Sequence, residues 1–324
     1  MQTIQNNIQD MQKIPIISFI IPAYNLPVDM LRECLESILA LSLSKDEREI
    51  IVVDDGSDIS PINELNDIAD DIIYIRQANR GLSAARNMGL MMATGRYIQF
   101  VDGDDKIIRV PYEHCLDIAR YHNPDLVLFD FTTRDADTPK TPFTYNGPLS
   151  GSDFMRNNNI RAAAWGYIFE KSMLGNLRFT TGLYHEDEEF TPQLFLRSER
   201  FYSTEAKAYF YRQREGSIVN NHNVEHTKKL FADTERILLH LKQLVVPDTD
   251  RPALNRRIAQ LTMDYIYNII RRTHDRRLLD ETMERLSGYG LYPLPDRDYT
   301  KKYKMFRKML STSLTRKLLF HIIK

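Results

Sequence analysis

Residues 16–25, IISFIIPAYN, form an apolar run that is interrupted by a proline near its end. Such a run is typical of a strand that is buried on both faces of a parallel sheet. Residues 49–58, EIIVVDDGSD, repeat the pattern, and between the two runs Leu31, Leu35 and Ile38 recur at helical spacing. The order strand, helix, strand predicts a parallel sheet in which the first strand is central.

The same alternation continues along the chain. A strand is expected at 72–75, a helix at 82–93, a strand from 97, a helix at 110–121 and a strand from 125. This rhythm is the signature of an open α/β sheet, whose ligands bind beyond the carboxyl ends of the strands.

The pattern changes twice after the last of these strands. A turn-rich, mixed α+β stretch follows residue 132, and the sequence from 225 onward has only helical periodicity. We therefore expect a loose leader at 1–14, a sheet domain at 15–224 and a helical region at 225–324.

Composition excludes several classes of protein. The 43 basic and 44 acidic residues give a net charge of −1, which argues against a general nucleic-acid binder. Cys34 and Cys115, the only cysteines, fall in predicted helices, so we expect buried thiols and a reducing compartment. No stretch approaches the roughly 20 apolar residues of a membrane span, and the amino terminus lacks a signal-peptide core. The sequence therefore predicts a cytoplasmic protein.

Acidic residues gather where two predicted strands end. Asp54 and Asp55 follow the second strand, and Asp102, Asp104 and Asp105 follow the fourth. In a parallel sheet both groups lie on one edge, where carboxylates repel one another unless a cation or hydrogen-bond donors compensate. A divalent metal bridging phosphates would satisfy Asp102 and Asp104. The alternative is a pair of ordinary Asp/Gly turns.

A candidate phosphate contact lies between these clusters, in NRGLSAARNMGL at 79–90. Arg86 falls in the first turns of a predicted helix. A helix amino terminus together with an arginine suits a phosphate oxygen. A solvated or ion-paired arginine is the alternative.

Six blocks in order carry a family resemblance: IISFIIPAYN, VVDDGSD, NRGLSAARNMGL, YIQFVDGDD, HEDEEF and YRQREGSI. Together they resemble the family 2 glycosyltransferases, over roughly residues 15–220. The resemblance implies an α/β fold of the GT-A type, with an open, mostly parallel sheet flanked by helices and, here, a C-terminal helical extension.

The resemblance also assigns roles to individual residues. It implies that Pro22, Ala23 and Tyr24 pack on the nucleobase and that Asp54 or Asp55 hydrogen-bonds the base. It implies that Arg86 holds the nucleotide-sugar and that Asp102 faces the ribose and sugar. It also implies that Asp104 ligates a divalent Mn²⁺ or Mg²⁺ ion in a DxD-type motif.

Further roles follow from the later blocks. Within HEDEEF the catalytic base falls on Asp187, with Glu186 beside it; without the family, this block reads as an acidic first turn that complements a helix dipole. Arg212 and Arg214 match a loop that folds over the diphosphate, or are surface charges. Trp165 either stacks on an acceptor sugar or packs in the core.

The implied function is inverting transfer of a sugar from a nucleotide diphosphate sugar, a UDP-sugar in our expectation, to a hydroxyl of a glycan or lipid-linked acceptor. The expected setting is bacterial surface-polysaccharide assembly at the inner face of the membrane. The donor sugar, the acceptor and the linkage stay open.

Three other readings compete with this function. A dinucleotide-dependent oxidoreductase needs a glycine-rich turn after the first strand, where this chain has PAYN. A sugar nucleotidyltransferase needs a glycine-rich basic loop at the same place. A non-catalytic nucleotide-sugar or glycan-binding module would keep the sheet and lose the chemistry.

The carboxyl end is basic, with eight Lys or Arg residues and no acid after Thr300. Helical spacing places five apolar residues roughly on one face, namely Met305, Phe306, Met309, Leu310 and Leu314, with Leu318, Phe320, Ile322 and Ile323 beyond. Such a segment can lie peripherally on an anionic leaflet, or it can pack its apolar face on the preceding helices.

Overall fold

The computed structural model describes residues 14–134, 141–213 and 223–323, so almost all of the expected leader lies outside it. Contacts divide the chain into two compact units. The sheet unit contains the described residues up to Pro148, together with Ala164–Gly182 and Arg200–Gln213. The helical unit contains Leu149–Ala163, Leu183–Glu199 and the described residues from 223 onward. The predicted domain boundary after residue 224 stays a prediction.

The first half of the sheet matches the expected alternation. Strand β1 (Ile17–Ala23) is buried along its whole length and pairs in parallel with β2 (Arg48–Asp54) and with β4 (Tyr97–Phe100). Strand β3 (Ile73–Arg76) pairs in parallel with β2 at the edge. The continuous apolar run thus indicated a central strand correctly.

The second half makes the sheet mixed. Its strands are β5 (Lys106–Ile107), β6 (Leu126–Thr132), β7 (Tyr145–Leu149), β8 (Tyr167–Glu170) and β9 (Phe201–Phe210). Strand β8 is antiparallel to both β4 and β6, whereas β6 and β9 are parallel. The order is β3-β2-β1-β4-β8-β6-β9-β5, with β7 beside β9. The strand from Asp125 therefore does not extend the parallel series directly, because β8 intervenes.

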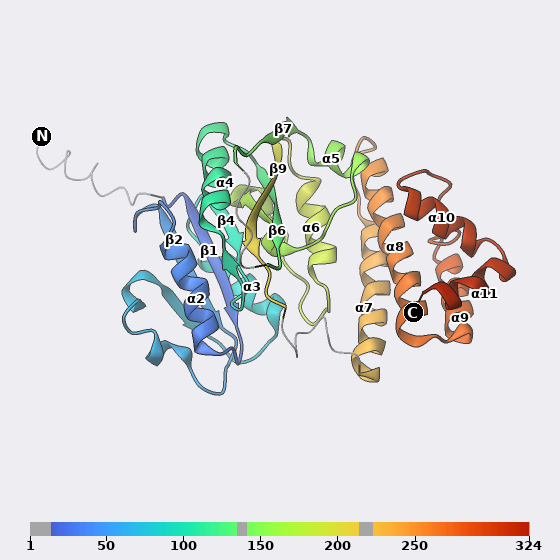
Figure 1. Cartoon of the computed structure of the whole chain (residues 1–324), viewed down its shortest axis with the longest axis horizontal. Coiled ribbons are helices and arrows are strands. Elements are labelled where there is room, and N and C mark those ends of the chain that lie inside the picture. The colour runs from blue at the N-terminus through green and yellow to red at the C-terminus, as the bar shows by residue number, and fades with distance from the viewer. Residues whose placement is uncertain (1–13, 135–140, 214–222, 324) are drawn as a thin grey trace, which may run out of the picture. The chain divides into compact units, whose positions relative to one another are not determined.

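Helices flank this sheet (Figure 1): α2 (Val28–Leu39), α3 (Leu82–Met92) and α4 (Arg109–His122). Cys34 on α2 and Cys115 on α4 are free and fully buried, which confirms the expectation of buried thiols. Short 3-10 turns occupy Pro61–Glu64, Ala69–Asp71, Ala164–Gly166 and Lys171–Leu174.

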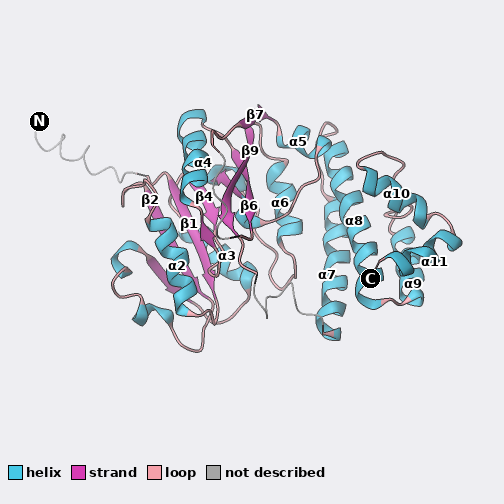
Figure 2. Cartoon of the chain, viewed as in Figure 1, coloured by secondary structure: helices cyan, strands magenta, loops and turns pink. Residues whose placement is uncertain are grey.

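The helical unit has an apolar core of its own. Its helices are cyan in Figure 2. Its members are α5 (Gly151–Asn157), α6 (Asp187–Phe195), α7 (Val224–Gln243), α8 (Arg251–Thr273), α9 (Arg276–Gly288), α10 (Lys301–Leu310) and α11 (Ser313–Ile322). From Val224 to residue 323 every regular element is a helix, as the periodicity predicted. In the part of the chain that the structure describes, no helix combines the length and apolarity needed to span a membrane.

The basic carboxyl end differs from the predicted single face. Thr312 interrupts the segment, because its hydroxyl accepts from Thr315 N at 3.2 Å and starts a new helix. Phe306 and Leu310 are buried in the core of the helical unit, whereas Met305 and Leu314 are exposed. The predicted common face for these residues was therefore wrong.

Candidate functional site

The two acidic clusters lie at the same edge of the sheet. Asp54 is the last residue of β2 and is in register with Ala23 of β1, and β4 runs parallel to the same strand and leads into Asp102. The predicted meeting of both strand ends is confirmed.

Asp54 organises the turn that follows β2. Its carboxylate is fully buried and accepts hydrogen bonds from Ser57 N at 2.9 Å and Tyr74 Oη at 2.7 Å. Burial acts to raise the pKa of Asp54, but these hydrogen bonds and nearby Arg76 outweigh it and leave the pKa below its ordinary value. Asp54 is thus an ionised carboxylate that holds the turn.

Asp55 connects β2 to the loop before α3. Its Oδ1 accepts from Gln77 Nε2 at 2.7 Å and from Arg80 N at 2.9 Å, and its Oδ2 accepts from Gly81 N at 2.7 Å. Gly81 has a φ of +85°, a left-handed backbone that glycine adopts readily. Asp55 therefore fixes the loop from which α3 and Arg86 begin.

Arg86 points to the end of β4. It is buried, with its guanidinium 5.8 Å from the centre of the Phe100 ring and 5.4 Å from that of Phe179. Its Nη2 donates to Asp102 Oδ1 at 2.8 Å. The ion-paired alternative for Arg86 is thus realised, and the pair fixes the orientation of the partly exposed Asp102 carboxylate.

The turn DGDD at 102–105 lies tightly against the end of β1. A Cβ on Gly103 would come within 2.7 Å of Leu26 Cδ1, so only glycine fits there without movement. Asp104 is partly exposed, and its backbone oxygen accepts from Arg212 Nε at 2.8 Å. The turn therefore presents the Asp102 and Asp104 carboxylates from a fixed backbone.

Asp105 is the buried member of this cluster. It accepts from Arg212 N at 2.7 Å and from Tyr209 Oη at 2.8 Å. Burial, with the neighbouring carboxylates of Asp102 and Asp104, raises the pKa of Asp105 to about 8. The carboxylates of Asp102 and Asp104 thus lie close enough to disfavour the charged form of Asp105.

The carboxylates of Asp102 and Asp104 fit a metal site that substrate phosphates would complete. Among the described residues, no group of three or more His, Cys, Asp or Glu side chains is arranged to hold an ion. Mg²⁺ is commonly held by only one or two carboxylates together with substrate phosphates and water. Asp102 and Asp104, both partly exposed, supply such a pair of oxygen donors.

The PAYN block forms the neighbouring surface. Pro22 and Ala23 are buried at the end of β1, whereas the Tyr24 side chain that follows is 48% exposed. An exposed aromatic ring beyond a central strand is available for stacking.

Trp165 is located in the interior of the sheet unit. Its ring stacks on that of Tyr209 at 4.5 Å between centres and an interplanar angle of 9°, and it also lies 5.7 Å from Tyr211. The side chain is buried. These contacts support the core-packing alternative over sugar stacking.

The HEDEEF block belongs to the helical unit. Asp187 is the first residue of α6 and is partly exposed, and Glu186, the residue before the helix, is buried. The acidic first turn complements the helix dipole, as expected without the family. Arg214 lies outside the described residues, whereas Arg212 binds the DGDD turn and also donates to Glu33 at 2.5 Å.

Tyr209 is a site residue that the sequence did not indicate. Its hydroxyl donates to Asp105 and accepts from Asp102 N at 3.0 Å, so it joins both ends of the turn. No motif contains Tyr209, and the pairings of β9 with β5 and with β6 bring it there. The alternation along β9 gave no signal for this residue, because Tyr209 shares its face of the strand with the exposed Glu205 and Lys207.

Tyr209→Phe is expected to lower the free energy of unfolding by about 1–3 kcal/mol, because it leaves buried Asp105 without a hydrogen-bond donor. Urea denaturation of the variant and of Tyr121→Phe, which changes an exposed tyrosine, measures this effect. Equal stability of the two variants would show that Tyr209 does not support the turn.

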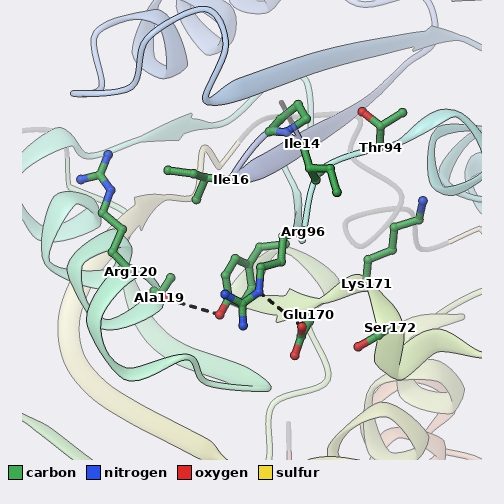
Figure 3. A pocket seen from close by; sticks show the side chains of 12 residues that line it. Ile14, Ile16, Thr94, Arg96, Ala119, Arg120, Glu170, Lys171 and Ser172 are labelled. Atoms are coloured by element: carbon green, nitrogen blue, oxygen red, sulfur yellow. Dashed lines mark hydrogen bonds and ion pairs between the residues drawn. The ribbon is translucent and has the colours of Figure 1, made fainter. Parts of the chain in front are cut away.

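A cavity of about 630 Å³ lies at the opposite edge of the sheet, near the starts of β1 and β4 (Figure 3). Its cations already bind protein acceptors. Arg96 Nε donates to Glu170 at 3.3 Å, and Lys171 Nζ donates to the Ala93 oxygen at 2.5 Å. We assign the candidate site to the carboxyl edge instead.

Comparison with known proteins identifies a family for the sheet region. Residues 18–176 match the model of Glycosyl transferase family 2. This region of the chain belongs to the family. The matched range includes β1, β2 and the DGDD turn that carry the clustered carboxylates.

This chain matches curated relatives over only part of their length. The chain is 29% identical over 222 residues to the uncharacterized glycosyltransferase YibD of Escherichia coli, 64% of each chain. It is 32% identical to glycosyltransferase GlyA of Streptococcus pneumoniae, over 62% of this chain and 31% of GlyA. It is 30% identical to the uncharacterized glycosyltransferase EpsJ of Bacillus subtilis, over 63% of each. The match thus spans less than two thirds of these three relatives.

Solved structures share the GT-A fold. S. aureus TarS 1-349, in complex with UDP-GlcNAc, aligns with a TM-score of 0.66 and 17% identity over 94% of this chain and 88% of TarS. The mannosyltransferase PcManGT from Pyrobaculum calidifontis, in complex with GDP-Man and Mn²⁺, aligns with a TM-score of 0.58 and 14% identity over 94% and 83%.

Proposed function

We propose that the protein is an inverting, metal-assisted glycosyltransferase that moves a sugar from a nucleotide diphosphate sugar, a UDP-sugar, to a hydroxyl of a glycan or lipid-linked acceptor. The observation that carries the proposal is the grouping of Asp102, Asp104 and Arg86 at the carboxyl edge of a family 2 sheet. Binding of UDP-GlcNAc by TarS supports the choice of donor class.

The donor would lie along this edge. Tyr24 is proposed to stack on the nucleobase beside Pro22 and Ala23, with Asp54 or Asp55, both buried at the end of β2, near the base. Asp102, held by Arg86, would bind the ribose and sugar hydroxyls. Asp102 and Asp104 would hold Mn²⁺ or Mg²⁺, which when bound neutralises charge on the diphosphate.

Asp187 is proposed as the general base. The acceptor oxygen forms a bond to the anomeric carbon while the bond from that carbon to the diphosphate oxygen breaks. The hydroxyl proton goes to the Asp187 carboxylate, and the nucleoside diphosphate leaves with the electron pair. This single displacement inverts the anomeric configuration. The role rests on the match of HEDEEF to the family's motif and on the partly exposed position of Asp187 at the start of α6.

Thermal unfolding with a panel of nucleotides tests the donor site. A bound donor stabilises the protein by mass action, by about 2.7 kcal/mol at a hundred times its Kd. We expect UDP and UDP-sugars with Mn²⁺ to raise the melting temperature more than GDP and GDP-sugars. Equal effects of all nucleotides, or none, would contradict the assignment.

The acceptor setting proposed is bacterial surface-polysaccharide assembly at the inner face of the membrane, with peripheral contact through the carboxyl end. Leu314, Leu318 and Ile322 recur every fourth residue on α11 and are 79%, 52% and 60% exposed. Lys317 lies beside this stripe. Among the described residues Lys317 forms no ion pair, whereas Arg316 pairs with Asp280 at 3.3 Å. An apolar stripe next to unpaired positive charge suits an anionic leaflet.

Leu314→Ser/Leu318→Ser is expected to reduce binding to vesicles of phosphatidylcholine with 30% phosphatidylglycerol by about 10²-fold, since each of the two lost side chains contributes about 1.5 kcal/mol of apolar burial and each 1.4 kcal/mol is tenfold in affinity. Co-sedimentation measures it. The control is Val245→Ser, which changes a 98% exposed residue of the same unit. Unchanged binding of the double variant, or a wild type that stays in the supernatant, would exclude this contact.

A further inference from the structure

A second cavity of about 330 Å³ lies wholly within the helical unit. It is formed by α7, α8, the start of α10 and the turn before α6, elements labelled in Figure 1. Part of its lining is apolar, including Leu230, Phe231 and Leu261. The volume is at the lower end of the range of about 300–1,000 Å³ for small-molecule sites, which suits a single sugar unit.

The α8 side of this cavity is polar. Asp264, Asn268 and Arg272 recur every fourth residue, so they form one stripe along the helix. All three residues are partly exposed, so the stripe borders the cavity with polar groups that remain open to water or to a ligand. Polar groups that are partly withdrawn from water are costly unless they are hydrogen-bonded.

Two cations, Arg272 and Lys302, line the cavity together with two acids, Glu188 and Asp264. Arg272 Nη1 is buried and has no hydrogen-bond partner among the described residues. The Lys302 ammonium lies 5.2 Å from the centre of the Tyr267 ring and lines the same cavity. Of the two acids, Glu188 is already paired with buried Arg257. An anionic group on a ligand would supply the acceptor that Arg272 lacks.

The same cavity adjoins the proposed catalytic base. His185 and Glu188, which flank Asp187 in the sequence, both contribute to its lining. His185 has a φ of +57°, an uncommon backbone for a residue with a side chain. The turn is anchored to α7, because Tyr184 N donates to Asp233 at 2.9 Å. The segment that presents Asp187 therefore also forms one wall of the cavity.

We propose that this cavity binds the acceptor, and that the unit it takes is a sugar ring that carries a carboxylate or a phosphate. Arg272 and Lys302 bind the anionic group, Asn268 and Asp264 bind hydroxyls, and Tyr267 and Phe231 contact the apolar faces of the ring. The assignment to the acceptor rests on the proposed function, whereas the binding of an acidic sugar can be measured without it.

Calorimetric titration with four probes tests the proposal: methyl glucuronide, glucose 6-phosphate, methyl glucoside and inorganic phosphate. We expect at least one acidic sugar to bind wild type at least tenfold more tightly than the neutral glucoside and than phosphate, as a charge-assisted hydrogen bond allows. Equal affinity for the glucoside overturns the anionic part, equal affinity for phosphate overturns the sugar part, and no binding overturns both.

Arg272→Gln is expected to weaken the acidic probe at least tenfold, whereas Arg271→Gln, the exposed neighbour outside the cavity, leaves it within about twofold. Lys302→Gln gives an independent test at the start of α10 should Arg272→Gln unfold. Equal effects at 271 and 272, with no effect at 302, would contradict the site.

Release of nucleoside diphosphate without acceptor separates this inference from the proposed function. If the enzyme hydrolyses its donor but binds none of the probes, the proposed function holds and the acidic-sugar site is contradicted. A protein that binds the acidic sugar but turns over no donor retains the binding site and loses the function.

Discussion

Asp104→Ala is expected to lose metal-dependent release of nucleoside diphosphate by about 10²-fold or more, since a metal contributes several kcal/mol and each 1.36 kcal/mol is tenfold in rate. Asp104 presents a partly exposed carboxylate from a turn whose backbone is held by Arg212 and by the close contact at Gly103. The side chain is not part of the apolar core, so the fold should survive. Initial rates with and without Mn²⁺, together with circular dichroism, measure both effects.

The matched control is Asp117→Ala, which removes an exposed carboxylate from α4 of the same unit. It should keep wild-type activity and metal dependence. Chelation of the wild type should reproduce the Asp104→Ala loss, and added Mn²⁺ should reverse it. Full activity of the variant, or of the wild type in chelator, would remove the metal role.

Asp187→Asn is expected to lower sugar transfer by about 10²–10⁴-fold, the usual contribution of general-base help, while donor affinity stays near that of the wild type. The change keeps the size of the side chain and removes its capacity to accept a proton. Asp187 begins α6 in the helical unit, whereas the proposed donor residues belong to the sheet unit, so donor contacts should be intact. Donor titration and acceptor-dependent rates measure the two quantities separately.

Asp153→Asn supplies the comparison, because it neutralises an exposed carboxylate in the first turn of α5, also in the helical unit. It should transfer at the wild-type rate. A loss of donor affinity as large as the loss of rate in Asp187→Asn would reassign Asp187 to donor binding.

The local sequence pattern predicted the first half of the sheet, whose parallel strands alternate with helices. The runs that became β1 and β2 are continuous and apolar because both faces of these strands are buried, and the helix between them repeats its apolar residues at helical spacing. The strand-end acids then followed from parallel pairing alone, and the structure places them as expected.

The antiparallel insertion of β8 between β4 and β6 was not predictable in this way. It joins Tyr97 to Glu170 and Leu126 to Phe169, pairings between residues far apart in the sequence. Such pairings depend on the completed tertiary structure, and the residues involved carry no distinctive local signal.

The same limit applies within the candidate site. Asp105 owes its environment to Tyr209 and Arg212, more than a hundred residues later in the chain. The polar stripe of Asp264, Asn268 and Arg272 is visible in the sequence, but its meaning depends on which helices cover it. At the carboxyl end the sequence pattern predicted a single apolar face, but the helix cap at Thr312 divides the segment into two helices.

The most direct test of the account is to incubate the whole chain with UDP-sugars and Mn²⁺ and to quantify nucleoside diphosphate and the released or transferred sugar by mass spectrometry. The account predicts stoichiometric UDP and sugar products from at least one donor, lost on chelation and in Asp104→Ala. A wild type that is thermally stabilised by a UDP-sugar but forms no UDP would contradict it and would identify a binding module instead.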